Sequence, residues 1–149
     1  MKALTLWQPW ASLVALGEKR IETRCWSTKY RGHLAIHAAA KTPAFLGASR
    51  HTEQFIAELA DVLNVRISAV PCAVAELPRS AVLCIVELCS IEETTRCREI
   101  LCERERIFGN YEDGRYAWAL EMVEKLEPPI PAKGNRLLWN WNEVSVVSR

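Results

Sequence analysis

The sequence lacks any long hydrophobic run. Half of its 149 residues are hydrophobic, but no apolar stretch approaches the roughly 18 residues that a membrane-spanning helix needs. The first residues lead directly into patterned sequence without a secretory signal. No repeat, low-complexity tail or linker interrupts the chain. We therefore expect a cytoplasmic protein with no membrane segment and a single domain over residues 1–149.

Metal-binding and redox patterns are also missing. None of the six cysteines forms a Cys-x-x-Cys pair, and the three histidines have no metal-ligand spacing. The sequence therefore predicts no metal site and no cofactor. In a cytoplasmic protein, the cysteines are interpreted as small buried hydrophobic residues.

The chain has little net charge, which is +1 at pH 7. This balance argues against a general polyanion binder. The distribution is uneven, because residues 1–41 hold seven Lys or Arg against two Glu, while residues 92–124 hold nine acidic residues against five Arg. The asymmetry indicates a basic face and an acidic face. Solvated charge on helices is the simpler explanation of the acidic half.

Apolar periodicity predicts short strands separated by helices. Strands are expected at 3–7, 19–24, 33–38, 80–91 and 116–123, with short closing elements at 137–141 and 144–147. Helices are expected at 9–16, 43–64 and 92–106. Two prolines make residues 70–79 irregular. Because strands and helices do not alternate regularly, the pattern predicts an α+β fold built around a small mixed β-barrel flanked by helices.

The most informative pattern is Gly-x-Lys-x-x-Glu-x-Arg at residues 17–24, which we call the charged motif. If this segment is extended, Arg20, Glu22 and Arg24 share one face. Two guanidinium groups held by a carboxylate suit a phosphate or carboxylate ligand. Lys19 stands at the start of the expected strand, where the incoming turn can aim its ammonium group toward the same cleft.

The loop after the charged motif combines aromatic rings with cations: Trp26, Lys29, Tyr30 and Arg31. Single-stranded nucleic acid binds such mixtures, because base–aromatic stacking contributes about 1–3 kcal/mol per base. Trp26 is therefore predicted to stack on a base, and Lys29 and Arg31 to hold phosphate. Packing in the core is the competing interpretation of Trp26.

Several other residues have one structural and one functional interpretation. Gln8 either caps a helix or reads a base edge, and capping is the simpler interpretation. Lys133 and Arg136 flank a glycine in a turn that could contact phosphate, or they are solvated loop charges. Four tryptophans are interpreted as packing residues: Trp7, Trp118, Trp139 and Trp141.

Two residues of the expected strands carry the same ambiguity. His37 is either a satisfied strand residue or a proton shuttle, for which an ordinary pKa near about 6.5 is suitable. Glu87 interrupts an apolar strand, and burial without a partner would be costly. It is expected to pair with Lys19 or Arg24, or to lie at an exposed end of the strand.

Three motifs together resemble the ASCH domain family. They are Leu-Trp-Gln-Pro-Trp-Ala-Ser-Leu at 6–13, the charged motif followed by Trp26, and Arg-Gly-x-Leu-x-Ile-His-Ala at 31–38. Weaker matches are Tyr-Ala-Trp-Ala-Leu-Glu at 116–121 and Pro-Ile-Pro-x-Lys-Gly at 129–134. The resemblance covers nearly the whole chain. It implies a PUA-like β-barrel, a fold shared with RNA-modification and RNA-binding modules, with a ligand cleft beside the charged motif.

The activities implied by the resemblance are mixed. Some members are nucleic-acid binders, one branch hydrolyses acetylcytidine, and ribonuclease activity has been proposed for others. In the hydrolase branch, the lysine that matches Lys19 acts with a threonine three positions later and a separate glutamate. Here that position is Glu22, and Thr23 lies on the opposite strand face, so the hydroxyl nucleophile is missing.

The first prediction is an RNA- or nucleotide-binding PUA-like domain. Its basic cleft would hold phosphate through Lys19, Arg24, Arg31 and Lys133 and would stack a base on Trp26. The predicted partners are RNA, another single-stranded nucleic acid, or a nucleoside.

Two other functions are kept as alternatives. One is a small hydrolase of amidohydrolase or ribonuclease type, acting on a modified nucleoside or RNA, with Lys19, Glu22 and His37 as acid–base groups. The other is a protein-interaction domain that uses the acidic helix expected at 92–106.

Overall fold

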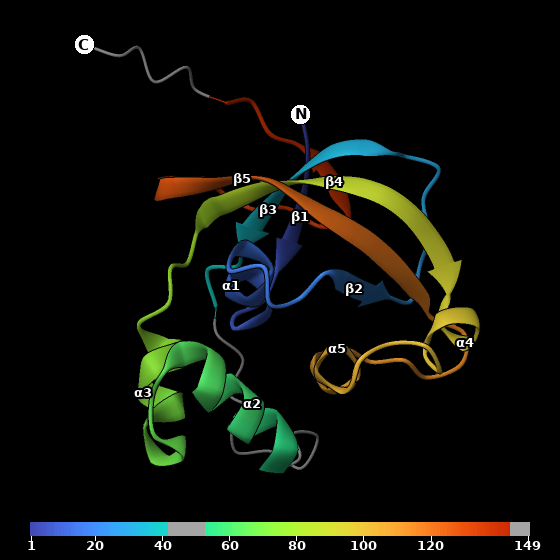
Figure 1. The fold of residues 1–149 in the computed structure, drawn as a ribbon. Helices are drawn as coiled ribbons and strands as arrows, with labels where there is room; N and C mark the ends of the chain where they lie inside the picture. Colours follow the sequence, from blue (N-terminus) through green and yellow to red (C-terminus); the bar gives the residue numbers. More distant parts are fainter. Residues whose placement is uncertain (42–52, 144–149) are drawn as a thin grey trace.

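The computed structural model describes residues 1–41 and 53–143. Its central element is a six-stranded sheet that curls into a half-barrel, with strand order β2-β5-β4-β3-β1-β6 (Figure 1). The strands are β1 (Lys2–Leu6), β2 (Ile21–Arg24), β3 (Gly32–Ala38), β4 (Ala81–Glu93), β5 (Tyr116–Pro131) and β6 (Leu138–Asn140). β1 and β3 are parallel, and the other pairs are antiparallel. The predicted α+β, PUA-like architecture is confirmed.

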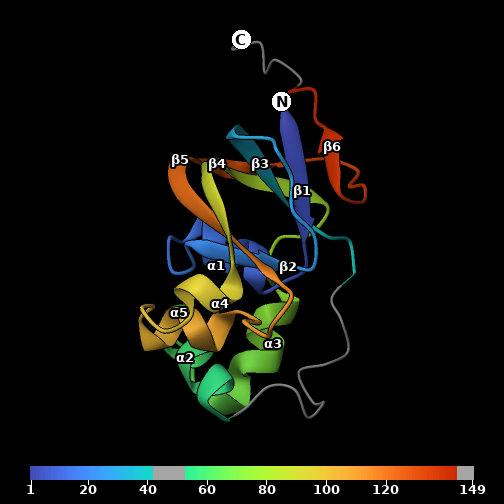
Figure 2. The same cartoon turned by 90° about the vertical axis from the view of Figure 1, so that its right-hand side faces the viewer.

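The helical segments lie below the sheet (Figures 1 and 2). They are α1 (Trp10–Ala15), α2 (Glu53–Leu63), η2 (Ile67–Ala69), α3 (Val70–Ala75), α4 (Thr94–Cys97) and α5 (Glu103–Phe108). α1 follows β1 and packs against β3 and β4, whereas α2 packs on α3 and α5. None of these segments in the described part of the chain is long and apolar enough to cross a bilayer.

Helix α1 connects two apolar cores. Val14 belongs to the cluster inside the curled sheet, which includes Leu34, Ile36 and Trp118. Leu13, the adjacent residue on α1, belongs to the cluster formed by the lower helices, with Phe55, Leu59, Val70, Val74 and Phe108. Consecutive helical residues point about 100° apart, so a short helix can fill both cores. The chain that leaves α1 is therefore fixed before it enters the charged motif.

Two helical predictions need correction. The first six residues of the segment expected to be irregular, 70–79, form α3 instead, and Pro71 lies in the first turn of this helix, where its missing amide hydrogen costs no helical hydrogen bond. The helix expected at 92–106 is divided into α4 and α5. Between them Ile100 is 83 % exposed.

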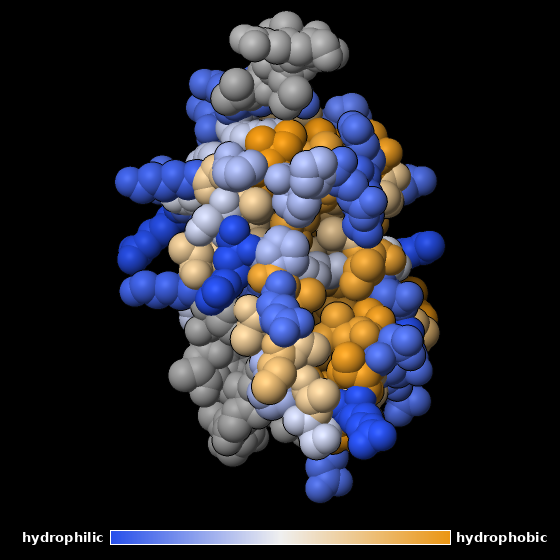
Figure 3. Space-filling view, turned by 90° about the vertical axis from the view of Figure 1, so that its left-hand side faces the viewer, coloured by the Kyte–Doolittle hydropathy of each residue, from blue (hydrophilic) through white to orange (hydrophobic). Residues whose placement is uncertain are grey.

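Apolar and hydrophilic surface are unevenly distributed. Figure 3 shows apolar surface both near the top of the molecule, at the level of the sheet, and over its lower part, where Figure 1 places the helices. Leu16 at the end of α1 and Ile67 of η2 are among the exposed apolar residues. Exposed apolar residues therefore occur on the helical segments and also on the sheet, where Met122 and Val123 of β5 are exposed.

Strand β2 is an edge strand that α5 holds in place. The buried carboxylate of Glu105 accepts hydrogen bonds from the amides of Arg20, at 3.1 Å, and Ile21, at 3.0 Å. The Leu120 amide of β5 donates to the Arg20 carbonyl at 2.8 Å on the other side. A charged acceptor that binds two backbone donors stabilises the folded backbone more than a neutral acceptor does. The beginning of β2 is thus positioned from a helix more than 80 residues later.

We expect Glu105→Gln to lower the free energy of unfolding by about 1.5–3 kcal/mol, because the amide offers one acceptor oxygen and turns a donor toward the second backbone amide. Urea unfolding at pH 7 measures the change. Glu99→Gln is the matched control, since Glu99 is exposed, and its effect should stay within about 0.5 kcal/mol. Equal effects of the two substitutions would contradict this account of β2.

Candidate functional site

Lys19 and Glu22 of the charged motif are buried, Arg24 is partly buried, and Arg20 is exposed. Lys19 is 1 % exposed, and its Nζ donates to the Ile21 carbonyl. Glu22 is 8 % exposed, and its Oε1 accepts the amide hydrogen of Thr23 at 2.8 Å. The strand begins at Ile21, two residues later than predicted. Lys19 therefore approaches the strand from the turn that leaves α1, with its ammonium group directed to the backbone.

Arg24 reaches across the half-barrel. Its Nη2 donates to the carbonyl of Thr5 at 2.9 Å, and its Nε is buried without a partner. Three strands (β5, β4 and β3) separate β2 from β1 in the sheet, so this bond spans the open side of the curl. The predicted carboxylate between two guanidinium groups is wrong, because no ion pair of the described residues includes Glu22.

The segment at 109–115 covers β2 from below. The Asn110 amide donates to Thr23 Oγ1 at 3.1 Å, and Arg115 Nη2 donates to the Thr23 carbonyl at 3.1 Å. The Tyr111 hydroxyl is buried without a hydrogen-bond partner. Burial, followed by the nearby carboxylate of Glu105, raises the pKa of Tyr111, so the phenol stays neutral.

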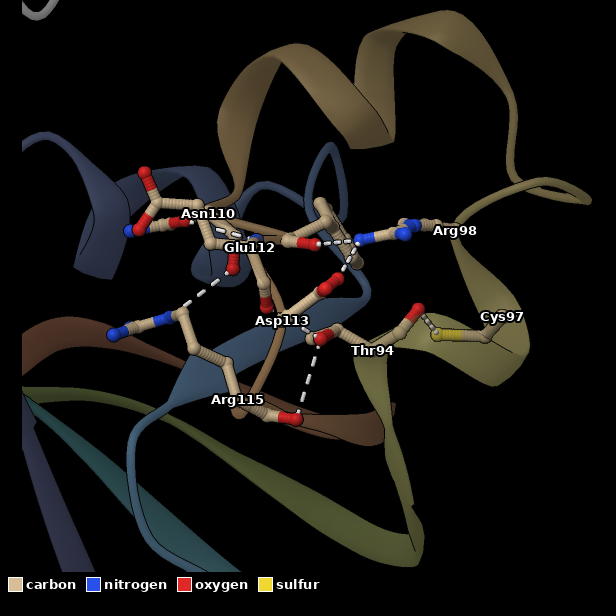
Figure 4. A network of polar contacts seen from close by, with 8 residues as sticks. Thr94, Cys97, Arg98, Asn110, Glu112, Asp113 and Arg115 are labelled. Atoms are coloured by element: carbon tan, nitrogen blue, oxygen red, sulfur yellow. Dashed lines mark hydrogen bonds and ion pairs between the residues drawn. The ribbon is translucent and has the colours of Figure 1, made fainter.

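Figure 4 shows how this covering segment is fixed to α4. The Thr94 hydroxyl donates to the Glu112 carbonyl at 2.7 Å, and Arg98 Nη1 forms an ion pair with Asp113 at 2.6 Å. The Arg115 Nε also donates to a carbonyl within the segment. Because these bonds fix backbone positions, the segment holds Asn110 and Arg115 against Thr23, which is buried.

An open groove lies instead where β1 and β3 end and the chain passes from β5 to β6. Its volume is about 980 Å³. We call it the basic groove; its lining residues are Thr5, Trp7, His37, Ala39, Ala40, Lys41, Ser80 and 131–136. Three of these side chains, Lys41, Lys133 and Arg136, are cationic, and none is acidic. The groove thus presents uncompensated positive charge beside an exposed indole.

Both ring nitrogens of His37 are engaged beside this groove. Nε2 lies 2.8 Å from the Ala132 carbonyl, which can only accept, so Nε2 carries the proton. Nδ1 lies 3.2 Å from Thr5 Oγ1. The Trp139 ring packs edge-on against the imidazole, with ring centroids 5.5 Å apart. Burial lowers the pKa of His37 and keeps the ring neutral at pH 7. The interpretation as a satisfied residue agrees with this geometry.

The aromatic loop lies outside the basic groove. Trp26 packs edge-on against Trp118, with ring centroids 4.8 Å apart, and remains partly exposed. Lys29 and Arg31 are exposed, and Arg31 Nη1 donates to carbonyls of its own loop. The structure thus distributes the predicted residues over separate places. His37 and Lys133 line the groove; Lys19, Glu22, Arg24, Trp26, Lys29 and Arg31 do not.

Sequence reasoning missed Trp7 and Lys41 as groove residues. Trp7 is 56 % exposed, so its interpretation as a packing residue is wrong. Trp7 follows Thr5 by two positions at the end of β1, and both line the groove. The period-two rule for strands could have placed them on one side. Lys41 offered no such signal, because only the tertiary fold brings it beside Lys133.

The bonding partners of Gln8 and Glu87 decide between the interpretations of these two residues. Gln8 is fully buried, and its Oε1 accepts the Ser12 amide at 3.0 Å in the first turn of α1, so the capping interpretation is confirmed. Glu87 pairs with the exposed His33 at 3.4 Å. The expected pairing of Glu87 with a cation of the charged motif is therefore wrong, and Glu87 lies partly exposed in the middle of β4 and not at its end.

The described residues contain no group of three or more His, Cys, Asp or Glu side chains arranged to hold a metal ion. All six cysteines are free. Only Cys84 and Cys97 are buried, and the other four are exposed: Cys25, Cys72, Cys89 and Cys102. The interpretation of the cysteines as buried hydrophobic residues therefore holds for two positions and is wrong for four.

Comparison with known proteins supports the sequence resemblance. The family model described as the ASCH domain matches residues 4–130. The protein named Activating signal cointegrator 1 is 54 % identical over 41 residues in Homo sapiens and 51 % identical over 41 residues in Mus musculus. Each match covers 28 % of this chain and 7 % of the relative. The matched segment is thus a small part of these longer relatives.

Protonation of His37 should oppose folding in acid. Its pKa lies below 6.5 in the folded protein, so the unfolded chain binds a proton first as the pH falls below about 6.5. The free energy of unfolding therefore decreases until the pH passes the lower, folded-state pKa. Urea unfolding at pH 7 and pH 5 should show a larger decrease for the wild type than for His37→Gln. The control variant, Gln54→Ala, changes an exposed residue that does not titrate and should keep the wild-type decrease; a decrease equal in all three would contradict the prediction.

Proposed function

The chain belongs to the ASCH domain family, and on this premise we propose that it is a binding module for single-stranded RNA. The basic groove holds the RNA: its cations contact phosphate, and Trp7 stacks on a base. This proposal keeps the predicted ligand class and moves the principal contacts away from the charged motif.

The observation that carries the proposal is the charge of the groove. Lys41, Lys133 and Arg136 come from two separate segments and line one opening without any acidic neighbour in its wall. None of the three takes part in an ion pair among the described residues. Cations that are not neutralised by the protein attract phosphate and release counterions when it binds.

The exposed indole of Trp7 supports a single strand over a duplex. Its ring lines the same groove as the three cations. Unstacked bases of a single strand present their faces to aromatic side chains, whereas a duplex hides them. Lys29, Arg31 and Trp26 stay predicted contacts of a longer strand that leaves the groove.

Removing two groove cations should weaken binding and its salt dependence together. For Lys133→Ala/Arg136→Ala, we expect the slope of log K against log salt concentration to fall by about 1.4, since each phosphate contact on a single strand contributes about 0.7. Fluorescence anisotropy of a labelled single-stranded RNA at several salt concentrations measures both quantities. Trp7→Ala should cost about 1–3 kcal/mol of binding free energy and leave the slope unchanged.

The matched control removes the same charge elsewhere. Arg66 and Arg96 are exposed and do not line the groove, so Arg66→Ala/Arg96→Ala should retain the wild-type slope. Equal slopes for both double variants, or no binding of RNA by the wild type, would contradict the proposed function.

A small hydrolase is the second candidate, because one observation favours it. Lys19 is buried at 1 % exposure, and none of the ion pairs among the described residues neutralises it. Buried lysines without a counterion are frequent among catalytic groups. The proposed partners Glu22 and His37 make no hydrogen bond to Lys19 within the described ranges, so the site would have to form around the substrate.

Turnover decides this second candidate. Modified nucleosides and RNA are incubated with the protein, and released acetate or cleaved RNA is measured. If Lys19 is the acid–base group, Lys19→Met should abolish product formation by removing the titrating group from a similar side chain. Product formation that persists in this variant would exclude the assigned role, and its absence from the wild type would exclude the hydrolase for the substrates used.

A further inference from the structure

We propose that Arg24 is a positioning residue for the basic groove, acting through Thr5 and His37 on the turn that carries Lys133 and Arg136. This inference rests on the proposed function, because it concerns how the groove is held ready for phosphate. It assigns to the charged motif a role other than direct ligand contact.

Arg24 is already committed to the protein backbone. Its Nη2 donates to the Thr5 carbonyl at 2.9 Å, and its buried Nε has no partner. Arg24 is not among the residues that line the basic groove, whereas Thr5 is. A cation in this position can influence a ligand in the groove only through the residue to which it is bonded.

Thr5 depends on this bond because its strand is weakly held there. The pairing of β1 with β6 covers Lys2 to Leu4 and stops before Thr5. On its other side, Thr5 is aligned with His37 of β3. The guanidinium of Arg24 therefore occupies a place where the neighbouring strand no longer continues, and it fixes the backbone of β1 at the edge of the groove.

In each hydrogen bond around Thr5, the donor and the acceptor can be assigned. The indole nitrogen of Trp139 can only donate, and it donates to Thr5 Oγ1 at 3.0 Å. Since the protonated Nε2 of His37 faces Ala132, its Nδ1 is an acceptor. The hydroxyl proton of Thr5 is thus directed to His37, and the chain of bonds runs from Trp139 through Thr5 and His37 to Ala132.

The turn that carries Lys133 and Arg136 packs directly on the hydrogen-bonded side chains of Thr5 and His37. At Gly134, an added Cβ would lie 2.5 Å from Cε1 of His37 and 3.0 Å from Oγ1 of Thr5. The turn thus has no space for a side chain at position 134, because its backbone lies close to both Thr5 and His37. Displacement of Thr5 or His37 must therefore move Gly134, and with it Lys133 and Arg136 on either side.

The test compares affinity with salt dependence. Arg24→Lys keeps the charge but loses the planar guanidinium, and Thr5→Val keeps the shape but loses the hydroxyl. Each should weaken binding of single-stranded RNA about tenfold, the order of effect when a partner that orients a binding group is lost, with the wild-type slope of log K against log salt. The double variant Arg24→Lys/Thr5→Val should bind RNA as strongly as the single variant that binds it more weakly, because both substitutions interrupt the same series of contacts.

Direct contact of Arg24 with phosphate would give a different result. Arg24→Lys would then retain most of the affinity, and Arg24→Ala would lower the slope by about 0.7. Either result would overturn the inference, as would additive losses in the double variant. If RNA binding is insensitive to Lys133→Ala/Arg136→Ala, the proposed function itself fails, which is a distinct outcome.

A spectroscopic measurement tests the path without RNA and on folded protein only. The indole N–H resonance of Trp139, assigned by its absence in Trp139→Phe, should shift in both Arg24→Lys and Thr5→Val. Lys29→Ala changes an exposed residue outside the groove and should leave this resonance unchanged. An unshifted resonance in Arg24→Lys would show that Arg24 does not act through Thr5.

Discussion

The fold depends on a side-chain bridge across the open side of a curled sheet, because the six strands do not close into a barrel. Six strands with β2 at one edge leave an open side, and the hydrogen bond from Arg24 to the Thr5 carbonyl of β1 crosses it. Strand pairing cannot stabilise this opening, because the two strands are not neighbours in the sheet. A long side chain with several donors can reach across, which explains why an arginine stands at this position of a short edge strand.

The position of β2 at the open edge of the sheet also explains why Lys19 and Glu22 of the charged motif are buried. A four-residue edge strand has few ladder hydrogen bonds, so side chains from elsewhere have to satisfy its backbone. Glu105 binds two amides at the start of β2, and Arg115 binds a carbonyl near its end. Charged residues in this region consequently serve the backbone, and the surface open to a ligand lies at the ends of β1 and β3.

The basic groove has the opposite character. Its cations come from the segment after β3 and from the turn after β5. The Ala132 carbonyl, next to Lys133, is bound by the neutral His37, which in turn bonds the Thr5 hydroxyl. Positive charge is therefore held in place without being neutralised. This combination distinguishes the groove from the helical face, where Arg104 is bound by Glu18, Glu58 and Asp61.

The sequence by itself determined the family, the α+β PUA-like fold and the capping role of Gln8, because these follow from local motifs and apolar periodicity. It also indicated Lys133 as a phosphate contact, but not its neighbours in space. Only the tertiary structure decided that Arg24 faces a backbone carbonyl, that Trp7 is exposed, and that Lys41 joins Lys133. Period-two alternation states which residues share a strand face, but not what covers that face. The cover comes from segments such as α5 and 109–115, which are distant in sequence and recognise backbone groups common to all residues.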